Sequence, residues 1–138
     1  MKLQLVREPL ALDALNDLCR SVGWKPANAE NYNLAVANSV ACVSAFLDSR
    51  PVGSGRLVGD VGMYLYIQDV IVHGELHKRG IGSRIVEELH QIAEQLDCRR
   101  DTIGLVASLD VCDFYEKLGY AESAPASKFL VRKVADPS

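Results

Sequence analysis

Glycine and basic side chains gather between residues 77 and 84, where the sequence reads HKRGIGSR. An apolar run precedes this segment and a helical repeat of apolar residues follows it, so the glycines lie at the expected start of a helix. A helix N-terminus exposes unpaired N–H groups and carries about half a positive charge. Glycine lets an anion approach the main chain, and Lys78, Arg79 and Arg84 add positive charge. The segment therefore indicates an anion site, above all for a pyrophosphate.

Short glycine patterns also occur in plain turns whose basic residues are simply solvated. The segment lacks the Gly-Lys-Ser/Thr ending of a Walker A loop, and the third glycine of a dinucleotide fingerprint is absent. On its own, the segment leaves the plain turn and the anion site both open.

The order of the expected elements predicts the fold class. No repeat or linker interrupts residues 1–138, which are expected to form one domain. The order β-α-α-β-β-β-α-β-α-β predicts an α/β (α+β) fold with a mixed sheet and helices on both faces. Strands are expected at Leu3–Val6 and at 40–47, 52–60, 64–72, 102–108 and 127–134; helices are expected from Pro9 to near Gly23, over 27–38, from Gly80 to about 97, and from an Asp110 cap to Gly119.

The run at 64–72 is apolar except for Gln68 and Asp69, which is typical of a central strand that is covered on both faces. Strict alternation predicts that Tyr66, Gln68, Val70 and Val72 share one face, and that Asp69 and Ile71 share the other.

Composition excludes several classes of protein. The net charge is −3, which argues against a surface built to bind nucleic acid. The cysteines Cys19, Cys42, Cys98 and Cys112 form no C-x-x-C pair, so they predict buried free thiols and no metal site. Because no apolar run reaches the length of a signal peptide or a membrane span, we expect a cytoplasmic protein without a membrane partner.

Two motifs together resemble the GNAT superfamily of N-acetyltransferases. His77–Gly82 resembles its acyl-CoA-binding motif, Q/R-x-x-G-x-G/A, which follows a strand ending in V-x-P. The segment FYEKLGY at 114–120 resembles its second hallmark, and the likeness extends over nearly the whole chain, as in small single-domain members. His77 stands where Gln or Arg is usual, Gly74 stands for the proline, and Ser108 stands where many members carry Asn. These departures are expected to weaken acyl-CoA binding without abolishing it.

The resemblance implies a mostly antiparallel central sheet and acetyl-CoA as co-substrate, with no metal. The pantetheine arm is expected to add along the central strand, and the pyrophosphate to meet the glycine turn. The implied cofactor-binding residues are Val70, Ile71, Val72, His77, Lys78, Arg79, Gly80, Ile81, Gly82, Ser83, Ser108 and Tyr115.

The resemblance also assigns catalytic roles. Tyr115 corresponds to the tyrosine that protonates the departing thiolate, although a core aromatic role is the alternative. The general base is expected to be Asp69 or His73, with a structural, hydrogen-bonded Asp69 as the alternative. Substrate-binding candidates near the N-terminal helices and the central strand are Trp24, Asn38, Arg56 and Gln68. The alternatives are that Trp24 fills the core and that Asn38 and Arg56 are solvated or structural.

The sequence thus predicts an acetyl-CoA-dependent N-acetyltransferase, an acyltransferase acting on the primary amine of an unidentified small molecule. Two alternatives stay open: an acyl-CoA-binding sensor without turnover, and an acetyltransferase of protein lysines or N-termini. The resemblance also allows a homodimer.

Overall fold

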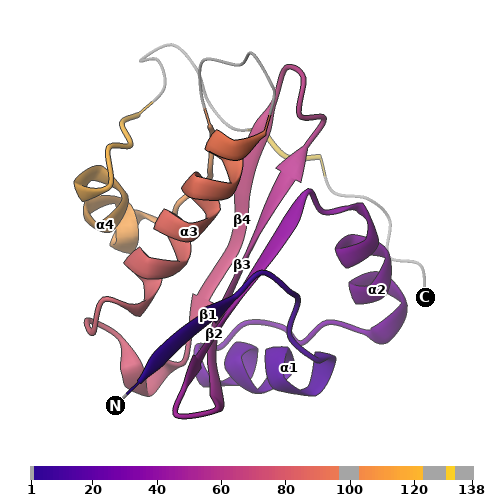
Figure 1. Cartoon of the computed structure of the whole chain (residues 1–138), viewed down its shortest axis with the longest axis vertical. Coiled ribbons are helices and arrows are strands. Elements are labelled where there is room, and N and C mark those ends of the chain that lie inside the picture. Colours follow the sequence, from indigo (N-terminus) through magenta and orange to yellow (C-terminus); the bar gives the residue numbers. More distant parts are fainter. Residues whose placement is uncertain (1, 97–102, 123–129, 133–138) are drawn as a thin grey trace. The chain divides into compact units, whose positions relative to one another are not determined.

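The computed structural model describes residues 2–96, 103–122 and 130–132 (Figure 1). The chain divides into two compact units, Met1–Leu105 and Val106–Ser138. The first unit carries the sheet and the helices around it, and the second carries a short helix. The expectation that residues 1–138 form one domain stays a prediction.

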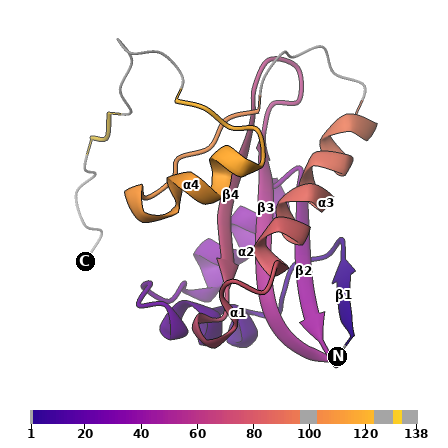
Figure 2. The same cartoon turned by 90° about the vertical axis from the view of Figure 1, so that its left-hand side faces the viewer.

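The first unit is built on an antiparallel sheet of four strands in the order β1-β2-β3-β4. The strands are β1 (Leu3–Val6), β2 (Ala41–Leu47), β3 (Arg50–Gly59) and β4 (Leu65–Val72). β4 is an edge strand of this sheet, as Figure 2 shows. One isolated parallel bridge joins Tyr66 to Gly104. The predicted mixed, mostly antiparallel sheet is confirmed.

Helices cover both faces of the sheet, as predicted: α1 (Leu12–Ser21) and α2 (Ala29–Asn38) lie on one side and α3 (Ile81–Gln95) on the other (Figure 1). The helix predicted to open at Pro9 begins instead at Leu12. Ala11 is still extended, with φ −58° and ψ 146°, and its carbonyl accepts the first helical bond from the N–H of Leu15.

The buried stripe of α3 packs on β2, β3 and β4. Its buried side chains are those of the predicted repeat: Ile81, Ile85, Val86, Leu89, Ile92 and Ala93. Two glycines in β3 let the helix come close, because a Cβ at Gly53 would lie 2.7 Å from Ile85 Cδ1 and one at Gly55 would lie 2.9 Å from Ile85 Cγ2. α3 is thereby seated directly over the main chain of β3.

One extra residue interrupts the pairing of β4 with β3. Ser54 pairs with Ile71 and Arg56 pairs with Gln68, so two steps along β3 match three along β4. Asp69 at this bulge has a φ of 55°, in the left-handed region that few non-glycine residues adopt. Because side chains alternate with a period of two, an extra residue exchanges the faces beyond it.

The predicted faces of β4 are therefore wrong in part: Asp69 and Ile71 share a face as predicted, but Gln68 does not lie on the face of Val70 and Val72. Paired residues lie on the same face, so Gln68 and Ile71 share the face of Arg56 and Ser54, together with Asp69, which bonds to Arg56. Val72 pairs with Gly53, on the face toward α3. Val70 also faces α3, since its Cγ2 lies 3.4 Å from the position of a Cβ on Gly55.

The elements predicted after residue 101 differ from those in the structure. The strand expected over 102–108 is reduced, in its described residues, to the bridge at Gly104, because no described residue continues the ladder beyond it. Of the strand expected over 127–134, only residues 130–132 are described, and they form no strand. Asp110 does not cap a helix: it lies within a 3₁₀ turn, η2 (Leu109–Val111), which runs into α4 (Cys112–Lys117).

No described helix has the length and apolar character needed to cross a membrane. Within the described residues no group of three or more His, Cys, Asp or Glu is placed to hold a metal ion. Cys19 and Cys42 are buried free thiols and Cys112 is half-buried, while Cys98 lies outside the described residues.

Gly74 anchors the end of β4 to α1. It opens a 3₁₀ turn, η1 (Gly74–Leu76), and its N–H donates to Ser21 Oγ at 3.0 Å. A Cβ at this position would lie 2.5 Å from the carbonyl oxygen of Ser21. Proline, which is usual at this position of the acyl-CoA-binding motif, has no N–H to donate to Ser21 Oγ. Any other side chain would clash with the carbonyl oxygen of Ser21, and this contact explains the glycine.

We predict that Gly74→Ala lowers the free energy of unfolding by about 2 kcal/mol, the usual cost of forcing an atom into a packed site. Gly62→Ala is the matched control, because its nearest neighbour would be Asp60 Oδ1 at 4.0 Å. Urea unfolding of both variants measures the difference. Equal stability of the two variants would contradict the anchoring role of Gly74.

Candidate functional site

The edge of β4 has a stretch of main chain whose polar groups point away from β3. The N–H of His73 donates to Val52 in β3, so the alternate residue Val72 turns its N–H and C=O outward. Val70 lies two residues before Val72, and the alternation of an extended strand implies that its main chain turns the same way. No described residue forms a strand beside this stretch, which we call the open edge. An extended ligand with amide groups could pair here as an added strand.

The opposite end of β4 is closed. Ile67 donates to the carbonyl of Gly104 at 2.9 Å, and Gly104 donates to that of Leu65 at 3.0 Å. The bulge at Asp69 separates this paired half from the open edge. The open edge therefore begins just after Asp69, where the bulge exchanges the two faces of β4.

The N-terminus of α3 offers unpaired N–H groups. Gly80 is the N-cap, with a φ of 81°, and no described side chain caps the helix there. Because the first helical bond runs from Arg84 to Gly80, the N–H groups of Ile81, Gly82 and Ser83 have no partner within the helix. The Ile81 side chain is buried, so only its main chain is available to a ligand. This arrangement suits an anion.

His77 and Lys78 shape the turn before α3. The Nε2–H of His77 donates to the carbonyl of Val72 at 2.9 Å, so its ring is turned to the open edge. Lys78 has a φ of 64°, in the left-handed region that few non-glycine residues adopt, two residues before Gly80. Arg79, Gly80 and Arg84 line an open hollow of about 460 Å³ beside Leu3 and Leu47. Positive charge therefore lies at the helix mouth, as the sequence predicts.

A cavity of about 250 Å³ lies within the first unit, which we call the α1–α2 cavity. Arg56, Asp69 and Ser54 form its polar part on the sheet, and Trp24 lies on the loop that joins the two helices. Its other lining residues are Pro9, Leu15, Cys19, Lys25, Ala27, Asn31, Tyr32, Ala35, Cys42 and Ile71. A concave apolar site with a few polar groups is the usual form of a small-molecule site.

Arg56 and Asp69 form the charged end of the α1–α2 cavity. Arg56 donates to Asp69 Oδ2 from Nε at 3.1 Å and from Nη2 at 2.6 Å. Its Nη1 donates to Ser39 Oγ at 3.0 Å. The Arg56 side chain is 22% exposed and that of Asp69 57%. The pair bridges β3 and β4 at the bulge, next to Val70.

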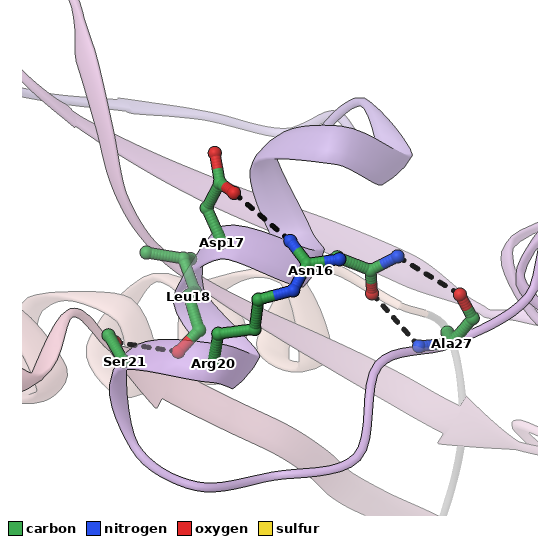
Figure 3. A network of polar contacts seen from close by, with 6 residues as sticks. All are labelled: Asn16, Asp17, Leu18, Arg20, Ser21 and Ala27. Atoms are coloured by element: carbon green, nitrogen blue, oxygen red, sulfur yellow. Dashed lines mark hydrogen bonds and ion pairs between the residues drawn. The ribbon is translucent and has the colours of Figure 1, made fainter.

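Asn16 holds the loop that forms one wall of the cavity. This side chain is buried in α1, donates to the carbonyl of Ala27 at 3.0 Å and accepts from its N–H at 2.9 Å (Figure 3). A reciprocal pair of this kind fixes the loop from Val22 to Asn28, which carries Trp24. Sequence reasoning passed over Asn16; a polar residue at a core position of an amphipathic helix was the available signal.

Three sequence candidates lie outside the lining of the α1–α2 cavity. Asn38 donates to the carbonyl of Leu34 in its own helix, and Gln68 shares the face of Arg56 without lining the cavity. His73 Nδ1 accepts from the N–H of Glu75 at 3.1 Å. The role of His73 as a base stays a prediction.

The second unit holds Tyr115 on α4, and Ser108 precedes η2 as its N-cap. The Tyr115 ring contacts those of Phe114 and Tyr120 edge to face, with centroids 4.9 and 5.8 Å apart. Burial raises the pKa of the Tyr115 hydroxyl, and burial with the Tyr115 charge raises the pKa of Tyr120 to about 12. Tyr115 therefore stays protonated at neutral pH, as a proton donor must.

We predict that Asn16→Ala lowers the free energy of unfolding by about 2 kcal/mol, because it leaves the half-buried N–H and C=O of Ala27 without their partner. Asn38→Ala is the control, since it removes one exposed bond within a helix. Urea unfolding measures stability, and limited proteolysis between residues 22 and 28 measures loop opening. If both variants lose the same stability and resist protease equally, Asn16 does not hold the loop.

The chain resembles known proteins in sequence. The acetyltransferase (GNAT) family model matches residues 10–120. Uncharacterized N-acetyltransferase ycf52 of Pyropia yezoensis is 32% identical over 118 residues, covering 83% of this chain and 67% of the relative. GCN5-related N-acetyltransferase 2, chloroplastic, of Arabidopsis thaliana is 32% identical over 126 residues, which cover 77% of this chain and 48% of that protein.

Solved structures share the fold. A Staphylococcus aureus protein of unknown function superposes with a TM-score of 0.85 at 20% identity, covering 96% of this chain and all (100%) of that one. A GNAT family acetyltransferase from Streptococcus pneumoniae superposes with a TM-score of 0.76 at 22% identity, over 96% of this chain and 100% of the other. The resemblance drawn from the two motifs is thus confirmed: the chain belongs to the acetyltransferase (GNAT) family and is an N-acetyltransferase, an acyltransferase.

Proposed function

We propose that the protein transfers the acetyl group of acetyl-CoA to the primary amine of a small-molecule acceptor. The observation that carries the proposal is the open edge of β4 beside the uncapped N-terminus of α3. A strand with outward main-chain groups suits the amides of a pantetheine arm, and unpaired helix N–H groups suit a pyrophosphate. In an N-acetyltransferase, these two features favour acetyl-CoA as the donor.

Main-chain groups would hold most of the cofactor. Val70 and Val72 would pair with the pantetheine arm, while Ile81, Gly82 and Ser83 would donate to the pyrophosphate. Lys78 and Arg79 would add charge around Gly80. Because His77 donates to the carbonyl of Val72, we propose that it stabilises the turn and does not bind phosphate. Its replacement of the usual Gln or Arg would then remove no contact to the pyrophosphate. Ile71 turns its main chain to β3 and would contribute its side chain to the acceptor side.

Asp69 is favoured over His73 as the base, because it lines the α1–α2 cavity. It would take a proton from the acceptor's ammonium group, and the nitrogen would then attack the acetyl carbonyl carbon. The C–N bond forms, the C–S bond breaks, and the outward N–H of Val70 would stabilise the negative charge on the acetyl oxygen. Tyr115 would protonate the departing thiolate and regain a proton from the positively charged nitrogen of the newly formed, N-protonated amide, while Asp69 returns its proton to solvent.

The α1–α2 cavity supports a small acceptor, since its volume of about 250 Å³ falls below the range of about 300–1,000 Å³ typical of drug-sized ligands. Trp24 and Arg56 line it and stay candidates for acceptor binding, whereas Asn38 and Gln68 do not line it. The homodimer and the cytoplasmic location stay predictions. One relative is named as chloroplastic, so cell fractionation has to decide the compartment.

Calorimetry with acetyl-CoA and a thiol-release assay over a panel of primary amines test the proposal. We expect binding of acetyl-CoA, and release of CoA thiol that depends on at least one small amine. Absence of both acetyl-CoA binding and amine-dependent thiol release would overturn the proposal. Acetylation of peptides alone would move the acceptor to protein lysines or N-termini.

We predict that Tyr115→Phe lowers kcat by about 100-fold, the lower end of the usual contribution of a general acid, at unchanged affinity for CoA. Tyr120→Phe is the matched control, because it makes the same change on a neighbouring ring of the same unit. Steady-state thiol release gives kcat, and calorimetry gives the affinity. An equal, small loss in both variants would exclude Tyr115 as the acid.

A further inference from the structure

The chemistry of the α1–α2 cavity narrows the acceptor, and this inference rests on the proposed function. Its walls are mostly apolar, from Leu15 and Trp24 on the helical side to Ile71 on the sheet. The charged groups that line it are Arg56, Asp69 and Lys25. What each of these can offer a ligand decides which acceptors fit.

Arg56 has little to offer an anionic ligand. Three of its five N–H groups are engaged: those on Nε and Nη2 donate to Asp69 Oδ2, and one on Nη1 donates to Ser39 Oγ. A ligand carboxylate at Arg56 would meet only the two remaining N–H groups, and it would lie beside the carboxylate of Asp69, which already neutralises the guanidinium. Lys25 is exposed, so its charge is solvated and gives a ligand inside the cavity little.

Asp69 has one oxygen to offer. Arg56 takes Oδ2, while Oδ1 accepts no hydrogen bond from any described residue. The bulge fixes the main chain of Asp69 at a φ of 55°, and Arg56 fixes its side chain, so Oδ1 is pre-oriented. An ammonium group is the natural ligand of such an oxygen. Asp69 also lies next to Val70 of the open edge, where the acetyl group is proposed to lie.

We propose that the α1–α2 cavity binds a small primary monoamine with an uncharged, apolar body, its nitrogen bonded to Asp69 Oδ1. The apolar walls take the body of the ligand. A carboxylate on that body would be desolvated there beside Asp69, with a guanidinium whose charge Asp69 already neutralises, which is costly. A second amine at the far end would meet no described carboxylate other than Asp69 among the lining residues.

Matched amines test the class of acceptor. 3-Methylbutylamine and leucine differ only in the α-carboxylate, and pentylamine and 1,5-diaminopentane differ mainly in the second amine. We expect kcat/KM by thiol release to favour each monoamine by about tenfold or more, given the cost of burying an unpaired charge. Preference for leucine, for the diamine, or for the side chain of Nα-acetyl-lysine amide would overturn the inference while leaving acetyl transfer intact.

Asp69→Asn tests the contact, because it keeps the shape and removes the charge. We expect KM for 3-methylbutylamine to rise about tenfold or more at unchanged CoA affinity, as hydrogen bonds to charged groups imply. Glu88→Gln is the matched control, since it also removes a carboxylate from an arginine pair, Arg7 Nε to Glu88 Oε1 at 2.7 Å, away from the cavity. An unchanged KM in Asp69→Asn would overturn the role of Asp69.

A binding readout separates this inference from the proposed function. We expect 3-methylbutylamine to raise the Tm of the wild-type protein and of Glu88→Gln, and leucine to leave it unchanged. Asp69→Asn should lose the shift, and so should Asp69→Gly, which also removes the carboxylate and accepts the φ of 55°, if the asparagine variant does not fold. A Tm shift with 3-methylbutylamine but no turnover would support the amine site and contradict acetyl transfer. Turnover of leucine equal to that of 3-methylbutylamine would support acetyl transfer and contradict the proposed selectivity for monoamines.

Discussion

One extra residue in β4 determines what this sheet can bind. The bulge holds Asp69 in a left-handed conformation, which costs about 1–3 kcal/mol in a non-glycine residue. The double hydrogen bond from Arg56 helps to offset that cost and ties the bulge to β3. Beyond it, the faces of β4 are exchanged: Val70 and Val72 turn to α3, while Asp69 and Ile71 turn to the α1–α2 cavity. The same residue that completes the cavity therefore begins the open edge.

The proposed cofactor side and the proposed acceptor side meet at this bulge, and they are built from different groups. The cofactor side uses main-chain groups, namely the open edge and the first N–H groups of α3, which tolerate a changed side chain such as His77. The acceptor side uses side chains on a rigid frame, with Arg56 orienting Asp69 and Asn16 holding the opposite wall. Gly74 joins them, since it seats the end of β4 against Ser21 at the end of α1.

Local signals carried the sequence predictions that succeeded. The stripe of α3 and the glycine at its mouth follow from spacing alone, and both are where the sequence places them. The prediction of strict alternation along β4 failed, because a bulge depends on the partner strand and leaves the apolar pattern of the strand almost unchanged. The roles of Asn16 and Gly74 depend on contacts with residues 11 and 53 positions away. The segment 102–108 has the composition of a strand, but its described residues pair with β4 only at Gly104.

Amide hydrogen exchange at Val70 and Val72 tests the central claim most directly, with Ile71, which faces β3, as the internal reference. In the free protein the N–H groups of Val70 and Val72 should exchange faster than that of Ile71, because they face the open edge. Saturating CoA should slow both by about tenfold or more, as expected when main-chain groups gain partners in an added strand. Exchange that is slow in the free protein, or that CoA leaves unchanged while calorimetry shows it bound, would contradict the account.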